Sequence, residues 1–135
     1  MKDDAATRTT ILLVDDSATD RTRSAGLLRK RRPDWNVVTV ENARDALTEL
    51  SGKSIDIVVS DLVMPEIDGR QLLRIMHNDH PLVPVVLMTA QGSDQIAAEC
   101  VGLGAANYVP KRLLAEQLVD VLAEVLRAEE AMLTT

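Results

Sequence analysis

Apolar residues along this chain fall into two alternating patterns. Short continuous apolar runs rich in β-branched residues predict buried strands, and between them apolar positions recur every three to four residues, which predicts helices. The predicted strands are Ile11–Val14, Val37–Val40, Ile55–Val59, Val85–Met88 and Asn107–Val109. The predicted helices are Ser17–Arg31, Ala43–Leu50, Gly69–Met76, Asp94–Gly102 and Leu113–Ala128. Five strand–helix units in succession predict an α/β fold, a doubly wound parallel sheet with helices on both faces.

Length and hydropathy limit the chain to one domain away from the membrane. The sequence has 135 residues, which is the usual size of a single globular unit. We expect a flexible N-terminus over residues 1–8, the domain over 9–128, and a helix extension or the start of a linker over 129–135. No apolar run approaches the roughly 18 residues that a membrane span requires.

Charge and cysteine content indicate which cellular compartment and which kinds of partner to expect. The net charge is -6 with 1% aromatic residues, so we expect no direct binding to nucleic acid. The N-terminus lacks the apolar segment of a signal peptide and Cys100 is the single cysteine, which together favour the cytoplasm. A basic run, "RKRRP" from Arg29, is interpreted as a solvated helix end that complements the helix dipole, with a docking patch as the alternative.

Polar residues follow the predicted strands where each strand ends. Asp15 and Asp16 follow the first strand, Asp61 the third, Thr89 the fourth and Lys111 the fifth. Because parallel strands bring their carboxyl ends to one edge, these side chains should meet there. Three carboxylates at one point repel each other unless a cation joins them, and a hard divalent ion such as Mg²⁺ prefers oxygen ligands. With the charge neutralised, one carboxylate can attack phosphorus.

Simpler structural explanations exist for each of these residues taken alone. Asp16 and Ser17 could cap the first helix, and Asp61 could be a turn residue before "MPEIDG". Thr89 alone is typical of strand or cap chemistry, and Lys111 alone is typical of a surface lysine. Their joint placement after successive strands would then need four independent coincidences, so we favour a shared site. Its Thr89 hydroxyl and Lys111 ammonium would stabilise phosphoryl oxygens.

Four segments in this order carry a family resemblance: "ILLVDDS", "IVVSDLVMPEIDG", "VVLMTA" and "ANYVPK". Over residues 9–128 the chain resembles the receiver domain of two-component response regulators. The resemblance implies a flavodoxin-like (βα)5 fold with strand order 2-1-3-4-5. It also implies a phosphoprotein of a phosphorelay in which Asp61 is the phosphoacceptor.

The resemblance also assigns roles to the other site residues. It implies that Mg²⁺ binds to Asp16, Asp61 and the backbone carbonyl of Val63, with Asp15 supporting the metal, through water. Thr89 and Lys111 would contact the phosphoryl group, and the small Ala90 would leave it room. Thr89 and Tyr108 would form the switch that repacks the face made by helix 94–102, strand 107–109 and helix 113–128.

One loop departs from the family pattern. The family places proline after the lysine, in a cis bond, whereas here Pro110 precedes Lys111 and Arg112 follows it. We expect a trans Lys111–Arg112 bond and a different path for this loop. This departure bears directly on whether Lys111 reaches the phosphoryl group.

Three functions follow as hypotheses. The first is a signalling switch that accepts a phosphoryl group from a histidine kinase or phosphotransfer protein and changes its affinity for a downstream effector domain or protein. Such a domain catalyses only its own phosphorylation and dephosphorylation, so it is not an enzyme in the usual sense. The second is a degenerate receiver that acts as a phosphorylation-independent interaction module. The third, a haloacid-dehalogenase-like phosphatase, is disfavoured because Ser17 occupies the position of that family's second aspartate.

Overall fold

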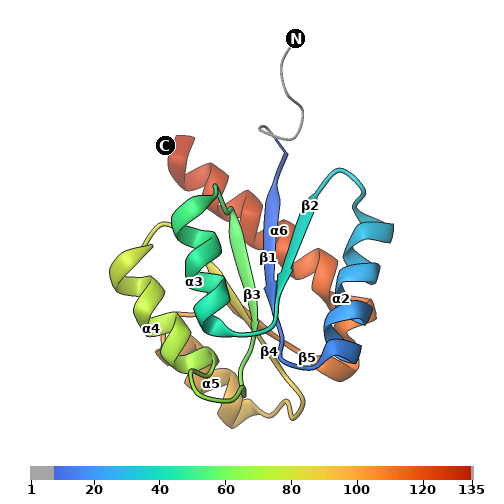
Figure 1. Cartoon of the computed structure of the whole chain (residues 1–135), viewed down its shortest axis with the longest axis vertical. Coiled ribbons are helices and arrows are strands. Elements are labelled where there is room, and N and C mark those ends of the chain that lie inside the picture. Colours follow the sequence, from blue (N-terminus) through green and yellow to red (C-terminus); the bar gives the residue numbers. More distant parts are fainter. Residues whose placement is uncertain (1–7, 135) are drawn as a thin grey trace.

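The computed structural model describes residues 8–134 and contains one five-stranded parallel sheet (Figure 1). The strands are β1 (Thr10–Val14), β2 (Asn36–Val40), β3 (Ile57–Asp61), β4 (Val85–Thr89) and β5 (Asn107–Pro110). The helices are α2 (Ala18–Arg31), α3 (Ala43–Gly52), α4 (Gly69–Asp79), α5 (Asp94–Gly102), the 3₁₀ turn η1 (Lys111–Leu113) and α6 (Leu114–Thr134). The strand order is β2-β1-β3-β4-β5, so the predicted fold class and topology are confirmed.

Helices cover both faces of the sheet, and each face has its own apolar core. On one face the helices α2 and α6 pack side chains such as Leu28 and Leu118 against Ile11 of β1. On the other face α3, α4 and α5 pack side chains such as Leu72 against Leu12 (Figure 1). The side chains of successive β1 residues therefore pack into the cores on opposite faces of the sheet, which explains why the strands are continuous apolar runs.

Most element boundaries lie within three residues of the predicted ones, and the largest difference is at the end of α6. β3 begins at Ile57 and not at Ile55. Just before it, the Asp56 carboxylate accepts the backbone N–H of Thr10 at 2.8 Å, and the Asp56 N–H donates to the Thr10 carbonyl at 3.0 Å. α6 continues to Thr134, six residues past the predicted end at Ala128. None of the helices between residues 8 and 134 is both long and apolar enough to cross a bilayer.

The predicted flexible N-terminus, residues 1–8, lies outside the described residues except for Arg8. The Arg8 guanidinium donates hydrogen bonds to the backbone carbonyls of Pro33, Asp34 and Trp35. The neighbouring basic run is also bonded locally. Arg29 donates to the carbonyl of Val37 at 3.0 Å, and the Arg32 guanidinium pairs with Asp34 and lies 4.1 Å from the centre of the Trp35 ring. These contacts favour the interpretation of this run as a helix end.

Candidate functional site

The carboxyl ends of β1, β3 and β4 lie at one edge of the sheet, the lower edge in Figure 1. Asp15 directly follows β1 and is fully buried. Its Oδ1 accepts the backbone N–H of Ser17 at 3.0 Å, and its backbone carbonyl accepts a hydrogen bond from Arg21 at 2.8 Å. These bonds hold the Asp15 carboxylate at the end of the sheet. Ser17, in turn, is the N-cap of α2, so the capping hypothesis is correct for Ser17.

Three carboxylates meet at this edge. Oxygens of Asp15, Asp16 and Asp61 all lie within 4.8 Å of one another, and no other group of three or more potential metal ligands of this kind occurs within residues 8–134. Asp15 and Asp61 are buried and Asp16 is exposed, so one side of the cluster opens to solvent. Like charges at this spacing are unfavourable without a cation, and a set made only of oxygen donors fits a hard divalent ion.

Lys111 reaches this cluster from the far edge of the sheet. Its ammonium lies 3.0 Å from Asp15 Oδ2, 3.0 Å from Asp61 Oδ2 and 2.9 Å from Asp20 Oδ2. Its side chain is only 15% exposed. The described residues contain no cis peptide bond, so Lys111–Arg112 is trans as expected. Lys111 begins the turn η1, and from there its side chain extends across the carboxyl edge to Asp61.

Burial and hydrogen bonding move the pKa values of these groups in opposing directions. Burial raises the pKa of Asp61 above its ordinary value, and the hydrogen bond from Lys111 only partly offsets this. Burial of Lys111 lowers the pKa of its ammonium, but the hydrogen bonds to Asp20, Asp15 and Asp61 outweigh burial and raise this pKa above the ordinary value. The hydrogen bond from Lys111 lowers the pKa of Asp20. Lys111 is therefore held firmly as a cation beside charged partners.

The carboxylates at this edge outnumber the cations that contact them. Asp15, Asp16, Asp20 and Asp61 carry four negative charges, whereas Lys111 supplies one positive charge in direct contact with three of them. The difference, four minus one, leaves three negative charges in the cluster. The donor set and this imbalance both fit a divalent metal ion.

The loop after β3 is fixed by a helix cap and a glycine. The Asp68 side chain accepts the backbone N–H of Gln71 and the Gln71 side chain accepts that of Asp68, which forms a capping box at the start of α4. A Cβ on Gly69 would overlap the carbonyl oxygen of Asp61 and lie 2.9 Å from Leu62 Cα. Glycine is therefore required for α4 to start this close to the candidate acceptor. Val63, between these points, is 70% exposed.

Thr89 ends β4 next to the cluster and is buried. Its hydroxyl donates to the carbonyl of Gln91 and accepts the N–H of the same residue, both at 3.2 Å. The following loop packs on Pro110, because a Cβ on Gly92 would lie 2.9 Å from the proline ring. Pro110 therefore contributes to the shape of the Thr89 loop as well as leading into Lys111.

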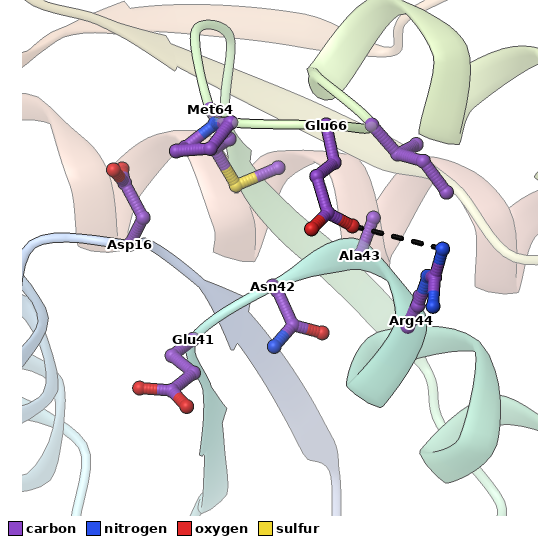
Figure 2. A pocket seen from close by; sticks show the side chains of 9 residues that line it. Asp16, Glu41, Asn42, Ala43, Arg44, Met64 and Glu66 are labelled. Atoms are coloured by element: carbon purple, nitrogen blue, oxygen red, sulfur yellow. Dashed lines mark ion pairs between the residues drawn. The ribbon is translucent and has the colours of Figure 1, made fainter.

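A cleft of about 540 Å³ opens over the cluster, and most of the predicted site residues line it. Its lining includes Asp16, Asp61, Val63, Thr89, Ala90 and Lys111. A second cleft of about 480 Å³ shares Asp16 with the first. Figure 2 shows this second cleft, with Asp16 on one side and the exposed ion pair between Arg44 and Glu66, 3.7 Å apart, on the other. Asp16 thus lines both clefts.

The structure adds two residues to the predicted site. Asp20 binds Lys111, and Arg70 lines the larger cleft while its guanidinium pairs with Glu99 of α5 at 2.6 Å. The signal for Asp20 was its position in the first turn of α2, four residues after the aspartates that follow β1. Tyr108 lies apart from the cluster: it is half-buried on β5 and packs on the core formed with α4 and α5.

Comparisons with known proteins show the family of this chain. The sequence profile of the response regulator receiver domain matches residues 11–123. The chain therefore belongs to the response regulator receiver domain family.

Individual relatives include longer regulators. The chain is 41% identical over 86 residues to the response regulator protein FleR of Pseudomonas aeruginosa, which covers 64% of this chain and 18% of that protein. It is 34% identical over 116 residues to the transcriptional regulatory protein ZraR of Salmonella typhimurium, covering 86% of this chain and 26% of that protein. The chain thus spans about a quarter or less of the length of these relatives.

A solved structure shows the same fold over nearly the whole chain. The signal receiver domain of an HD domain-containing protein from Pseudomonas fluorescens superposes with a TM-score of 0.82 at 26% identity, covering 92% of this chain and 98% of that one.

Proposed function

We propose that this domain is a phosphoacceptor switch, in which Asp61 receives a phosphoryl group from a histidine kinase or a phosphotransfer protein. One observation carries the proposal: the Lys111 ammonium lies 3.0 Å from Asp61, and the same Asp61 carboxylate shares an acidic cluster with Asp15 and Asp16 at the base of an open cleft. A nucleophilic carboxylate, a fixed cation and a set of metal ligands are the parts that phosphoryl transfer needs.

The transfer step exchanges one bond to phosphorus for another. An oxygen of Asp61 attacks the phosphorus of the donor phosphohistidine, a P–O bond forms, the P–N bond breaks, and the released imidazole takes a proton from solvent. Asp15, Asp16, Asp61 and the backbone carbonyl of Val63 would hold Mg²⁺, which neutralises charge on the transferring phosphoryl oxygens. Lys111 donates hydrogen bonds to those oxygens, and Ala90 leaves space for them.

Water reverses the modification by attacking phosphorus and breaking the P–O bond to Asp61. The domain then catalyses only its own phosphorylation and dephosphorylation and turns over no separate substrate. Val63 borders the cleft and is aliphatic, so its side chain cannot hydrogen-bond an attacking water. We expect slow hydrolysis for this reason.

The signal leaves the site through Thr89. In the described structure the Thr89 hydroxyl is bonded to the backbone of Gln91. A phosphoryl group on Asp61 offers it a charged acceptor, and exchange of partners would move the loop after β4. Tyr108 then turns inward, and the face formed by α5, β5 and α6 repacks. We assign this face to the downstream effector domain or protein.

The partners follow from this chemistry. A phosphohistidine donor and an effector are required, and the similarity to regulators such as FleR and to the sensor kinase CckA of Brucella abortus supports both kinds of partner. We place the domain in the cytoplasm, with no direct contact to nucleic acid or membrane. The alternative of a phosphorylation-independent interaction module depended on a displaced Lys111. The 3.0 Å distance from Lys111 to Asp61 supports the phosphoacceptor instead.

The test is the intact mass of the protein after incubation with a small phosphodonor, such as acetyl phosphate, with Mg²⁺ or with a chelator. We expect one added phosphoryl group in the wild type that requires Mg²⁺ and is absent in Asp61→Asn. Asp79→Asn, which removes an exposed carboxylate at the end of α4, serves as the matched control and should be modified like the wild type. Modification that survives Asp61→Asn would refute the assignment. If the wild type takes no phosphoryl group, even from a kinase, the interaction module replaces this proposal.

A further inference from the structure

Asp20 is a fourth carboxylate at the site and has no role in the transfer step described above. It lies in the first turn of α2, and its Oδ2 accepts a hydrogen bond from Lys111 at 2.9 Å. An ammonium has three N–H donors. In the described structure those three donors match three acceptors, one oxygen each from Asp15, Asp20 and Asp61. Asp20 therefore completes the coordination of Lys111.

The three acceptors differ in what happens to them during the reaction. Asp15 and Asp61 belong to the cluster that fits a metal ion, and Asp61 also gives an oxygen to phosphorus. Asp20 does not belong to the group of carboxylates whose oxygens lie close enough to share an ion. Asp20 is thus the partner that Lys111 can keep when a metal and a phosphoryl group occupy the other two.

Lys111 needs such a partner because of where it starts. It is the first residue of the short turn η1, which follows edge strand β5 and has no side-chain cap. From there its long side chain must stay extended over the carboxyl edge. A free lysine side chain has about 2 kcal/mol of rotamer entropy to lose when it is held in one conformation. Asp20 approaches from the first turn of α2, and its hydrogen bond to the ammonium offsets this cost.

We propose that Asp20 is a positioning residue that holds the Lys111 ammonium beside Asp61 before and after phosphorylation. The inference rests on the proposed function. It predicts that removal of the Asp20 carboxylate slows phosphorylation of Asp61 although Asp20 touches neither the metal nor the donor. Small displacements of a positioned catalytic group reduce rates strongly, and we expect roughly a tenfold loss in Asp20→Ala. Asp20→Asn keeps an acceptor oxygen without the charge and should lie between Asp20→Ala and the wild type.

The experiment compares phosphorylation rates from acetyl phosphate at saturating Mg²⁺ in the wild type, Asp20→Ala, Lys111→Met and the double variant. If Asp20 acts through Lys111, Asp20→Ala has no further effect once Lys111 is methionine. Asp45→Ala is the matched control, because Asp45 occupies in α3 the same position after the cap residue as Asp20 in α2. It should be phosphorylated at the wild-type rate.

A second readout follows Lys111 without any phosphorylation. Acetic anhydride labels uncharged, accessible amines, and tandem mass spectrometry reports the labelled fraction of each lysine. We expect Lys111 to be protected in the wild type and in Asp45→Ala, and labelled several-fold faster in Asp20→Ala. If Asp20 only stabilised the first turn of α2, its removal would not selectively increase the labelling of Lys111.

Each outcome separates this inference from the proposed function. If the wild type is phosphorylated and Asp20→Ala matches it in rate and labelling, the role of Asp20 is refuted while the switch stands. An equal further loss in the Lys111→Met background would show that Asp20 acts by itself, which also refutes the inference. If the wild type is not phosphorylated at all, the proposed function fails and the positioning role falls with it.

Discussion

Replacement of Lys111 by methionine tests how far one ammonium balances the acidic cluster. Methionine keeps an unbranched side chain but removes the charge and all three hydrogen bonds to Asp15, Asp20 and Asp61. Asp15 is fully buried and the Asp61 side chain is only 11% exposed, so both carboxylates would be left without a cation in a poorly hydrated place. The expected result is a marked loss of stability in metal-free buffer.

The size of this loss can be worked out from burial. Removal of one partner from a buried ion pair costs about 3–5 kcal/mol. The Asp20 side chain is 32% exposed and can turn to water, which places the estimate near the lower limit, about 3 kcal/mol. For a domain of this size that loss lowers the melting temperature by about 10 °C. Lys30→Met removes the same charge from an exposed position on α2 and should change the melting temperature by about 1–2 °C at most.

Mg²⁺ should reverse much of the loss. A ligand at 100 times its dissociation constant stabilises the folded state by about 2.7 kcal/mol. Because Lys111 contacts two of the three predicted carboxylate ligands of the metal, its removal also ends a competition for them, so Mg²⁺ should raise the melting temperature more in Lys111→Met than in the wild type. The assay is thermal unfolding by circular dichroism, with a chelator or with increasing MgCl₂.

Low pH should also reduce the difference in stability between the wild type and Lys111→Met. Burial already raises the pKa of Asp61 with Lys111 present, and loss of the ammonium raises it further. A carboxyl group with a raised pKa in the folded state destabilises the fold above that pKa and ceases to do so as the pH falls through it. The deficit of Lys111→Met should therefore be largest at neutral pH. The reasoning would be refuted if Lys111→Met were as stable as the wild type in chelator at pH 7. It would also be refuted if Mg²⁺ stabilised Lys111→Met and the wild type equally.

Three further substitutions test the loop that carries the site, each by thermal and urea unfolding. Gly69→Ala should lower the free energy of unfolding by about 1–3 kcal/mol and slow phosphorylation, because the alanine methyl group would overlap the backbone of Asp61. An unchanged stability would mean that α4 can shift freely. Glu66 has φ 65°, so Glu66→Gly should stabilise the domain by about 0.5–1 kcal/mol, and a lower melting temperature would contradict the strain. Asp68→Ala should cost about 1 kcal/mol through loss of the capping box, whereas an unchanged urea midpoint would show the cap to be dispensable.

Much of the fold was predictable because its signals are local. Apolar runs of three to five residues and helical periodicity placed all five strands and five helices, and α5 was predicted at its observed bounds, Asp94–Gly102. Parallel strands place their carboxyl ends at one edge, so the residues after each strand could be assigned to one site before any coordinates. Asp15, Asp16 and Asp61 lie within 4.8 Å of one another for this reason.

Other features depended on contacts between distant parts of the chain. Just before the observed start of β3 at Ile57, Asp56 forms hydrogen bonds with Thr10 of β1, and no local pattern encodes these bonds. The reach of Lys111 was uncertain from sequence because Pro110 and Arg112 alter its loop. Whether Lys111 reaches the acidic cluster depends on the packing of β5 against β4, since this packing sets the direction in which the Lys111 side chain leaves the sheet.

The contact between Asp20 and Lys111 shows most clearly what the sequence alone could not predict. Sequence by itself determined that a helix begins after Ser17 and that an acid in its first turn is favourable there. Only the tertiary structure decided that this acid faces a lysine 91 positions later, 2.9 Å away. Periodicity and capping are properties of neighbouring residues, whereas the distance between two side chains on α2 and η1 depends on how both pack against the sheet.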